Sequence, residues 1–446
     1  MSEHTLIHKL GGAKPETGHF LEFLENPAHF LLHAYHEGGE LTEIDLGGMR
    51  NVLMVGPDAH EAVFRAPDQQ LSAAAPYAYM VPVFGEGIQY GAPLELERQQ
   101  VKMQANALRA SKMKGYAGVI AQEVEDWVAN WGDEGEIDVV TEFQALVLRT
   151  STHCLMGTEF RNKLTDEFGA LYHDLECAVS AEAILDPYGA GEIFEKRDRA
   201  RARLQEIVMD VIEERRAEGG GKEYFDMLDT FMGAEYVDGS KLPDEQIPGM
   251  VVWIMFGGFH TSSNTAAWTL VELARNPQFV PQIKAEVDQI FGGQSGGNLE
   301  YAAMREIPML DSFVGEALRL HPPLCTLMRQ VMQEFEYKGN TIPVGDTLVI
   351  SPYVSHRVPE YFPDPERFDP GRTPSENVFA YIPFGGGARK CVGNAFAMLQ
   401  VKAIFCALLS RYEFELVGDP EDIVDSMPSL ILRPSDPCRV KYRRRS

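Results

Sequence analysis

The segment Phe384-Gly-Gly-Gly-Ala-Arg-Lys-Cys-Val-Gly393 is the most informative stretch of the chain. Its three consecutive glycines permit a tight turn in which the backbone can lie close against a flat ligand. Cys391 stands just before a helix that is predicted to begin near Gly393, where unpaired amides and the positive end of the helix dipole favour a thiolate over a thiol. Arg389 and Lys390 add positive charge beside that sulfur. The segment therefore predicts a ligating cysteine; a glycine-rich loop around an ordinary buried cysteine is the alternative.

Charge and hydropathy exclude several classes of protein. The chain has 446 residues, 40 of them basic and 66 acidic, for a net charge of −26, whereas a nucleic-acid binder needs a basic surface. The longest apolar run, Met250 to Phe259, is much shorter than the roughly 20 residues that span a bilayer. The first residues show no basic region followed by an apolar stretch, so no signal peptide or membrane anchor is expected. These features predict a cytoplasmic protein.

The other five cysteines are predicted to be structural. None of the six belongs to a Cys-x-x-Cys pair, which disfavours a zinc knuckle or a thioredoxin-type site. Disulfides are not expected in a reducing cytosol. Small buried hydrophobes are the simplest interpretation of Cys154, Cys177, Cys325, Cys406 and Cys438.

Helical periodicity dominates the chain. The longest predicted helix begins around Asp244 and ends at Asn276, where Pro277 stops it. Its middle, Val251 to Phe259, is apolar all round, as expected of a helix that crosses a core. A hairpin is predicted for residues 41–46 and 51–55, which flank two glycines. Other helices are predicted over 100–131, 137–157, 162–181, 192–218 and after Gly393, and strand-like pieces over 334–351.

The organisation predicted from these elements is one large domain, residues 1–446. Length alone suggests about three domains, but the glycine-rich stretches 219–221 and 292–297 are too short to be more than surface loops, and there is no internal repeat. The fold class is therefore mainly α with small β-sheets. The absence of an alternating strand–helix rhythm disfavours a parallel-sheet dinucleotide fold.

The cysteine segment resembles that of the cytochrome P450 family, which reads Phe-x-x-Gly-x-Arg-x-Cys-x-Gly. All fixed positions are present: Phe384, Gly387, Arg389, Cys391 and Gly393. The resemblance implies a cytochrome P450 fold in which haem b (iron protoporphyrin IX) is buried between two core helices. Cys391 would be the metal ligand, and the other four residues would contact the cofactor.

A second motif is Glu316-Ala-Leu-Arg319, in which Glu and Arg share one helix face. Such pairs also occur on many solvated helices. Together with Pro365-Glu-Arg-Phe368, however, it resembles the family's buried network, which implies that Glu316, Arg319 and Arg367 lock the core.

A third motif is Gly257-Gly-Phe-His-Thr261 in the long helix. Glycines within a helix cost stability, so a pair of them suggests that something approaches the backbone there. The family resemblance identifies this as dioxygen, with Thr261 supporting proton delivery. Close packing of a neighbouring helix is the alternative.

His260 stands where most family members have an acid, and His260-Thr-Ser-Ser263 is similar to the sterol 14-alpha-demethylase branch. Tyr77 to Gly91 and Leu320 to Leu324 match the same branch. Gly91 and Gln100 depart from it, because the branch has an Asp and often a haem-contacting Lys there. In the branch this histidine pairs with an acid from another helix, and alignment suggests Glu176 as a catalytic partner. A core histidine bonded to a backbone carbonyl is the alternative.

The same resemblance predicts the remaining contacts. Tyr77, Arg329 and Arg389 match positions that contact haem propionates. The substrate pocket would be aromatic, aliphatic and Met-rich, which suits a large apolar molecule, although each of its residues could equally be plain core. Its members would be Tyr77, Met80, Phe84, Phe256, Phe259, His260, Leu324, Leu327, Met328, Met427 and Leu430.

The function implied is that of a haem-thiolate monooxygenase that activates dioxygen to oxidise a sterol. Hydroxylation of another steroid, a terpenoid or a fatty acid is nearly as well supported. A haem-thiolate binding or sensor protein without turnover is an alternative of another class, and a peroxide-driven enzyme is disfavoured by Thr261. Electrons would come from a ferredoxin-type iron–sulfur protein with its reductase, attracted to Arg389, Lys390 and Lys402.

Overall fold

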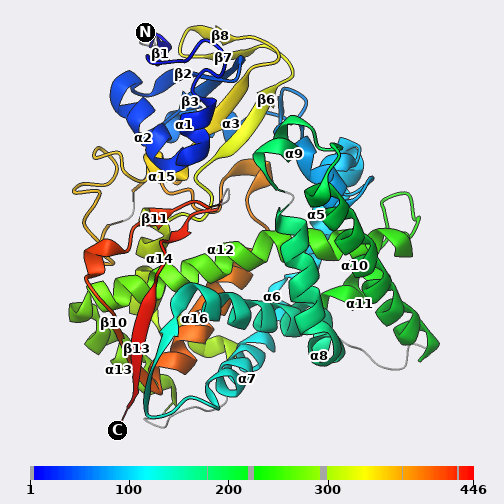
Figure 1. Ribbon diagram of the computed structural model, residues 1–446, viewed down its shortest axis with the longest axis vertical. Helices are drawn as coiled ribbons and strands as arrows, with labels where there is room; N and C mark the ends of the chain where they lie inside the picture. The colour runs from blue at the N-terminus through cyan, green and yellow to red at the C-terminus, as the bar shows by residue number, and fades with distance from the viewer. Residues whose placement is uncertain are drawn as a thin grey trace. The chain divides into compact units, whose positions relative to one another are not determined.

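The computed structural model describes residues 5–177, 179–218, 226–291, 299–373, 375–428 and 431–445. Helices dominate and the sheets are small, as Figure 1 shows, so the predicted fold class is confirmed. The chain forms two compact units. The first comprises Met1–Ala78, Gly315–Cys391 and Asp425–Arg433, and the second comprises Tyr79–Val314, Val392–Val424 and Pro434–Ser446.

A six-stranded sheet organises the first unit. Its order is β1-β2-β3-β9-β6-β4, and β3 and β9 pair in parallel. The predicted hairpin is confirmed as β2 and β3, with a turn at Gly47 and Gly48, both of which have positive φ. The strands are β1 (His8–Lys9), β2 (Leu41–Leu46), β3 (Met49–Met54), β4 (Leu71–Ser72), β6 (Leu327–Val331) and β9 (Thr347–Ile350).

Both faces of this sheet are covered, because successive side chains of a strand point to opposite faces. Val52 and Met54 of β3 belong to a core cluster with Phe64 of α3 (Pro57–Arg65). Leu53, between them, belongs to a second cluster with Leu31 of α2 (Pro27–Gly38). The unit also contains α1 (Phe20–Glu25), β7 (Phe335–Tyr337), β8 (Asn340–Ile342), α15 (Pro352–Ser355), η6 (Gly387–Arg389) and β11 (Asp425–Ser426).

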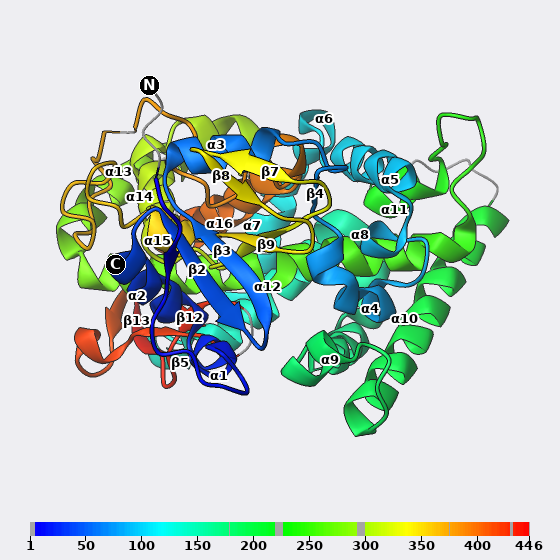
Figure 2. The ribbon, with the colours of Figure 1, turned by 90° about the horizontal axis from the view of Figure 1, so that it is seen from above.

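The long predicted helix is the centre of the second unit. The 3₁₀ turn η3 (Asp244–Gln246) leads into α12 (Ile247–Arg275), which is about 43 Å long at 1.5 Å per residue. It ends as predicted, with Pro277 directly after Asn276. α12 packs against α8 (Val139–Cys177), α10 (Glu192–Ala217), α11 (Met227–Met232) and α16 (Asn394–Leu409), and α4 (Val81–Phe84) packs against both α10 and α12 (Figure 2).

The helix α8 contains the two helices predicted over 137–157 and 162–181, joined across a kink. It is one element with a sharp break at Gly157, which has a φ of 86° and a ψ of 168°. The side chain of Arg215 clamps the break: Nη2 donates to the carbonyl of Met156 at 3.1 Å, and both terminal nitrogens bind Asp226, at 2.9 and 2.7 Å. A buried ion pair thus satisfies the carbonyl at the end of the first helical half.

The predicted helix over 100–131 is also divided. It consists of α5 (Leu94–Ala107), α6 (Ala110–Met113) and α7 (Tyr116–Val128). The extended backbone of Arg109 separates α6 from α5. The remaining elements are η1 (Ala75–Met80), η2 (Gln89–Gly91), α9 (Ala181–Leu185), η4 (Pro277–Phe279), α13 (Val280–Phe291), η5 (Tyr301–Arg305), α14 (Pro308–Leu320), η7 (Pro420–Asp422) and β12 (Arg433–Pro434).

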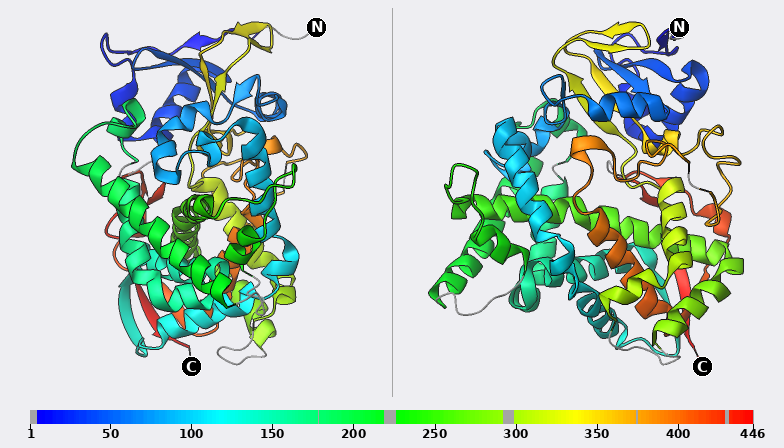
Figure 3. Two further views of the ribbon diagram at one scale, coloured as in Figure 1. Left: turned by 90° about the vertical axis from the view of Figure 1, so that its right-hand side faces the viewer. Right: turned by 180° about the vertical axis from the view of Figure 1, so that it is seen from behind.

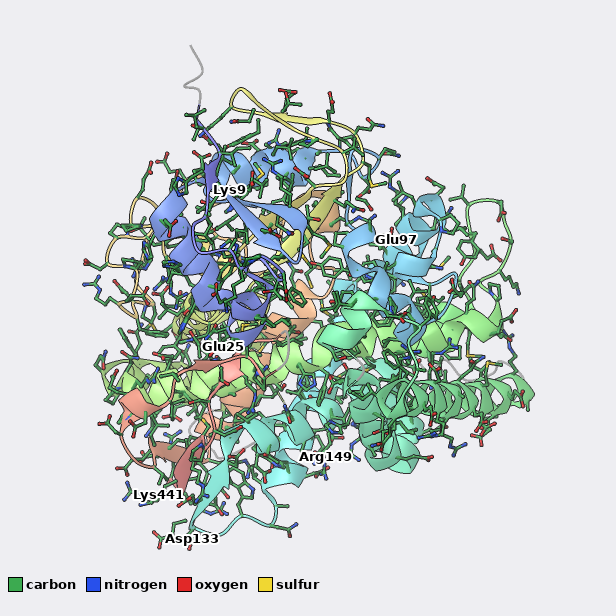
Figure 4. The ribbon with its side chains drawn as sticks, turned by 45° about the horizontal axis from the view of Figure 1, so that its top comes forward. Lys9, Glu25, Glu97, Asp133, Arg149 and Lys441 are labelled. Atoms are coloured by element: carbon green, nitrogen blue, oxygen red, sulfur yellow. The ribbon has the colours of Figure 1, made fainter. Side chains whose placement is uncertain are left out.

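A three-stranded antiparallel sheet completes the second unit, in the order β10 (Tyr412–Leu416), β13 (Arg439–Arg444), β5 (Glu134–Asp138). Figure 3 shows β5 beside the C-terminal strand, and Figure 4 labels Asp133 and Lys441 at this sheet. Among the residues that the structure describes, no helix is both long enough and apolar enough to cross a membrane.

Candidate active site

The cysteine segment is a turn fixed from both ends. The amide of Cys391 donates to the carbonyl of Phe384 at 2.9 Å, and Gly385 and Gly387 both have a φ of 65°. A Cβ atom on Gly387 would lie 2.0 Å from the carbonyl oxygen of Phe64. Glycine is therefore required here by the left-handed backbone and by close packing on the end of α3. The thiol of Cys391 lies exposed at the end of this turn.

The unit that carries Cys391 also carries the three predicted propionate-binding side chains. Met328 on β6 donates its amide to the hydroxyl oxygen of Tyr77 at 3.1 Å, and burial raises the pKa of Tyr77, so the phenol stays a protonated donor. Arg329, the next residue of β6, donates to the Met328 carbonyl at 2.8 Å. Arg389 binds Asp68 at 3.0 Å. All three are N–H or O–H donors of the kind that bind carboxylates.

The buried pair predicted on α14 is present, but its third member differs. Arg319 binds both carboxylate oxygens of Glu316, each at 2.9 Å. Arg372 approaches the same carboxylate at 3.4 Å with only 11% of its side chain exposed, whereas the side chain of Arg367 is 63% exposed and binds Asp369. The backbone carbonyl of Arg367, not its guanidinium, contacts Arg319, at 3.2 Å. Arg372 therefore takes the place that was predicted for Arg367.

The glycine pair of α12 borders open space. Among the described residues, no heavy atom lies within 4 Å of a Cβ placed on Gly257 or Gly258. Close packing of another helix, the alternative explanation, therefore does not account for the pair. The hydroxyl of Thr261 donates to the carbonyl of Gly257 at 2.8 Å, which commits its hydrogen to the helix and leaves its oxygen as an acceptor.

The structure brings His260 and Glu176 together. The Nε2 atom of His260 is in ion-pair contact with a carboxylate oxygen of Glu176, and the amide nitrogen of Gln144 lies 3.5 Å from Nδ1. Both partners of the pair are largely buried. A histidine that faces a carboxylate is placed to exchange a proton with it. The alternative, a histidine bonded only to a backbone carbonyl, does not describe this geometry.

Sequence reasoning missed Tyr172. Its ring lies 5.2 Å from that of Phe259 and 5.5 Å from that of Phe256, and burial together with the charge of Glu176 raises the pKa of its hydroxyl. Tyr172 precedes Glu176 by four residues, so helical spacing places the two on one face. That spacing was the available signal.

The remaining predicted pocket residues fall into both units. In the second unit, Met80 is buried and Phe84 makes an edge contact with Phe256, with ring centroids 5.6 Å apart. In the first unit, Leu324 is 42% exposed, and the thiol of Cys325 contacts the sulfur of Met427 at 3.7 Å. Leu327 and Met328 pack on the two core clusters of the sheet, which agrees equally well with a plain core role. Leu430 lies outside the described residues.

The other predicted cysteines and cations can also be placed. Cys154, Cys325, Cys406 and Cys438 are buried, as predicted, while the side chain of Cys177 lies outside the described residues. Of the three cations expected to attract an electron donor, only Lys390 is exposed. Lys402 binds Asp311 at 2.5 Å, and Arg389 binds Asp68, so their charges are already compensated.

A comparison with family models decides the relationship: the model described as "Cytochrome P450" matches residues 10–442. The chain belongs to the cytochrome P450 family. It is therefore a monooxygenase, and membership implies a haem cofactor and an electron-donating partner.

Relatives of this P450 are similar over nearly their whole length. It is 39% identical to "Sterol 14alpha-demethylase" of Mycolicibacterium vanbaalenii over 98% of each chain, and 39% identical to the protein of the same name from Mycobacterium tuberculosis over 99% and 98%. It is 32% identical to "Lanosterol 14-alpha demethylase" of Rattus norvegicus over 97% and 86%. A solved chain, "Retinoic acid bound cyanobacterial CYP120A1", shares the fold with a TM-score of 0.87 over 99% of both chains at 21% identity.

Proposed function

We propose that this P450 oxidises a sterol at a haem b whose iron is bound by Cys391. The observation that carries the reaction is the strip Gly257–Thr261 of α12, where open space beside two glycines adjoins an acceptor hydroxyl and a buried His–Glu contact. The full-length similarity to relatives named as sterol demethylases supports the substrate class.

The residues present fit a haem. Cys391 offers one exposed sulfur as an iron ligand on a turn whose glycines hold the backbone against α3. Tyr77, Arg329 and Arg389 offer donors for two propionates, and Phe384, Gly387 and Gly393 would complete the cofactor contacts. When bound, the haem supplies the activation of dioxygen, and the protein supplies orientation, protons and a dry pocket.

The protein's own residues would deliver protons to the site. Glu176 receives a proton from solvent and passes it to Nε2 of His260. The hydroxyl oxygen of Thr261 is held in place because its hydrogen is donated to the carbonyl of Gly257. This oxygen can accept a hydrogen bond from a group that occupies the open space beside Gly257 and Gly258. Tyr172, Phe256 and Phe259 exclude bulk water from this side, which strengthens each electrostatic contact.

Electrons would come from a separate ferredoxin-type protein with its reductase. Lys390, next to the proposed ligand, is the exposed cation available to an acidic donor. The neighbouring cations are engaged in ion pairs and contribute less to attraction.

Two spectral measurements test the proposal. Reduced haem-loaded protein should give, with carbon monoxide, the long-wavelength absorbance band of sulfur-ligated ferrous haem, and Cys391→Ala should lose it. A lanosterol-type sterol should then produce a low-to-high-spin Soret shift and be oxidised with NADPH and donor proteins. Absence of the carbon monoxide band would overturn the ligand assignment; a shift with other lipids but not with the sterol would overturn the substrate class.

Oxidation of another steroid, a terpenoid or a fatty acid is a second candidate, favoured by one observation. Gln100 is fully buried, where its side chain accepts from the amide of Gln89 at 3.0 Å and donates to the carbonyl of Gly87 at 2.8 Å. This residue stabilises the loop after α4, whereas the sterol demethylase branch often has a haem-contacting Lys at the position. The departure changes a segment that adjoins Phe84 of the predicted pocket.

A further inference from the structure

A cavity of about 380 Å³ lies in the second unit, where the loop after α4 meets α10 and the start of α12. Phe84, Ile88 and Val252 contribute apolar surface, and Arg201, Gln205 and Gln246 contribute polar groups. The volume lies within the range of small-molecule sites.

Arg201 differs from its neighbours on α10. Among the described residues no carboxylate pairs with its guanidinium, and its Nε atom, like that of Arg215, is buried without an acceptor. By contrast, Arg197 donates to the carbonyl of Pro187, and the guanidinium groups of Arg203, Arg215 and Arg216 bind carboxylates. Since no described carboxylate compensates the guanidinium, an anionic group that reaches its terminal nitrogens would be bound favourably.

The guanidinium of Arg201 lies at the cavity wall. A Cβ on Gly85, another lining residue, would be 3.2 Å from its Nη1 atom, and Gly85 has a φ of 107° that disfavours any larger residue. The local sequence thus leaves room for the arginine beside the loop.

The cavity adjoins the aromatic side of the proposed active site. Phe84 lines it and contacts Phe256, while Val252 stands one helical turn before Phe256 on α12. An apolar body that extends from the cavity along α12 would therefore meet this aromatic pair first.

Two carboxylates also line the cavity and oppose an anion. Glu86 accepts the hydroxyl of Tyr188 at 2.9 Å, which disperses part of its charge, and Glu245 is exposed, where solvent screens it. Neither forms an ion pair with Arg201 among the described contacts.

We propose that this cavity binds the carboxylate end of an amphipathic lipid, with Arg201 as the anion-binding residue. Fatty acids, named above among the second candidates for the substrate, carry such a carboxylate, whereas sterols do not. Binding at Arg201 is measurable without oxidation, so this site and the sterol reaction can fail separately.

Calorimetric titration of the haem-loaded protein with decanoate and with 1-decanol, at an ionic strength near 0.15 M, tests it. The wild type should bind decanoate more tightly than the alcohol, and Arg201→Met should weaken decanoate binding about tenfold while leaving decanol binding unchanged, because a charge-assisted hydrogen bond is lost. Arg201→Lys, which keeps the charge, should retain part of the preference and should fold if the Met variant does not.

Arg203→Met is the matched control, since Arg203 lies two residues away on α10 and binds Glu167 and Glu206. It should behave as the wild type, and Glu245→Gln should raise decanoate affinity. Equal affinity for decanoate in the wild type and Arg201→Met, or no binding by the wild type, would overturn the proposal. A missing sterol-induced Soret shift would instead count against the sterol reaction alone.

Discussion

Two arginines five positions apart show what a motif can and cannot specify at the scale of a residue. Arg367 lies within the segment Pro365–Phe368 and Arg372 follows that segment by four residues, so sequence alone allows either to be the partner of the buried Glu316. The guanidinium of Arg372 turns inward, where it approaches Glu316 and donates to the carbonyl of Arg367 at 2.9 Å. The motif identifies the network, but the loop geometry chooses the side chain.

Replacement of each arginine should separate their roles. Arg372→Leu should lower the free energy of unfolding by about 1–3 kcal/mol, because Glu316 loses one donor in a buried site while keeping Arg319. Arg367→Leu is the control and should cost less than about 1 kcal/mol, since its ion pair is exposed. Urea unfolding of both variants measures this, and equal losses would contradict the assignment.

Glu176 offers a test of the proton route. Glu176→Gln should reduce turnover at least tenfold, because an amide cannot receive and release the proton that the carboxylate passes to His260. The carbon monoxide spectrum and the sterol-induced Soret shift should not change. Asp174→Asn, two residues earlier on α8, is the matched control and should retain full turnover. Normal turnover in Glu176→Gln would remove the route.

Site residues were predictable from the sequence to different degrees, for a physical reason. The cysteine turn, the α12 strip and the His260–Glu176 contact follow from local motifs or from alignment, and the structure brings the last two residues together. Tyr172, Arg372 and Arg201 depend on how helices and loops orient their side chains. For Arg372 and Arg201 that orientation is set by tertiary packing and could not be derived beforehand, whereas the four-residue spacing of Tyr172 and Glu176 was a usable signal.

At the scale of elements, the helix ends near Gly157 and before Pro277 were predicted correctly, whereas the division of residues 100–131 was not. The long helix α12 ends as expected because proline cannot continue it. The break in α8 falls at Gly157, where the first of the two predicted helices was expected to end. Here the buried pair Arg215–Asp226, from elements distant in sequence, stabilises the break.

Gly157→Ala should destabilise the protein by at least about 2 kcal/mol. A side chain disfavours the positive φ of this residue, and its Cβ would lie 2.5 Å from a carboxylate oxygen of Asp226. Gly115→Ala is the control, because its φ is negative and its Cβ would meet no described atom within 4 Å. Thermal unfolding of the two variants measures this. Similar melting temperatures would contradict the requirement for glycine at residue 157.

The second half of α8 also carries Tyr172 and Glu176. The same variant should therefore lower turnover by more than its loss of stability explains, when it is assayed well below its unfolding temperature. Loss of turnover in Gly115→Ala would instead point to a general effect of substitution on the helices.

For the whole molecule, stability should depend on pH through two buried histidines of the first unit. Burial lowers the pKa of His60 to about 4 and that of His356 well below its usual range. Nδ1 of His60 faces the carbonyl of Phe379 at 2.8 Å, and Nε2 of His356 accepts the amide of Ile382 at 2.9 Å. Both rings are thus held neutral in the folded state.

The contribution of His60 and His356 to the free energy of unfolding should be fully present above pH 6.5 and should fall as the pH drops toward 4. In this range the unfolded chain takes up protons on these histidines and the folded chain does not. For His60 alone the loss at pH 5 is about 2 kcal/mol. Urea midpoints at pH 7 and pH 5 measure it. His60→Gln should show a smaller difference between the two pH values, whereas His36→Gln, at an exposed position, should match the wild type. An unchanged difference in His60→Gln would contradict the prediction.

The parallel pairing of β3 with β9 has a consequence for synthesis in the cell. Residue 54 leaves the ribosome about 290 residues before residue 347, which at 5–20 residues per second is roughly 15–60 s. For that time the nascent β2–β3 hairpin presents an open, apolar strand edge, the kind of template on which chains aggregate. The yield of expressed protein should therefore rise with chaperone supply and with a lower growth temperature. This rise should be larger than the stability of the folded protein alone would suggest.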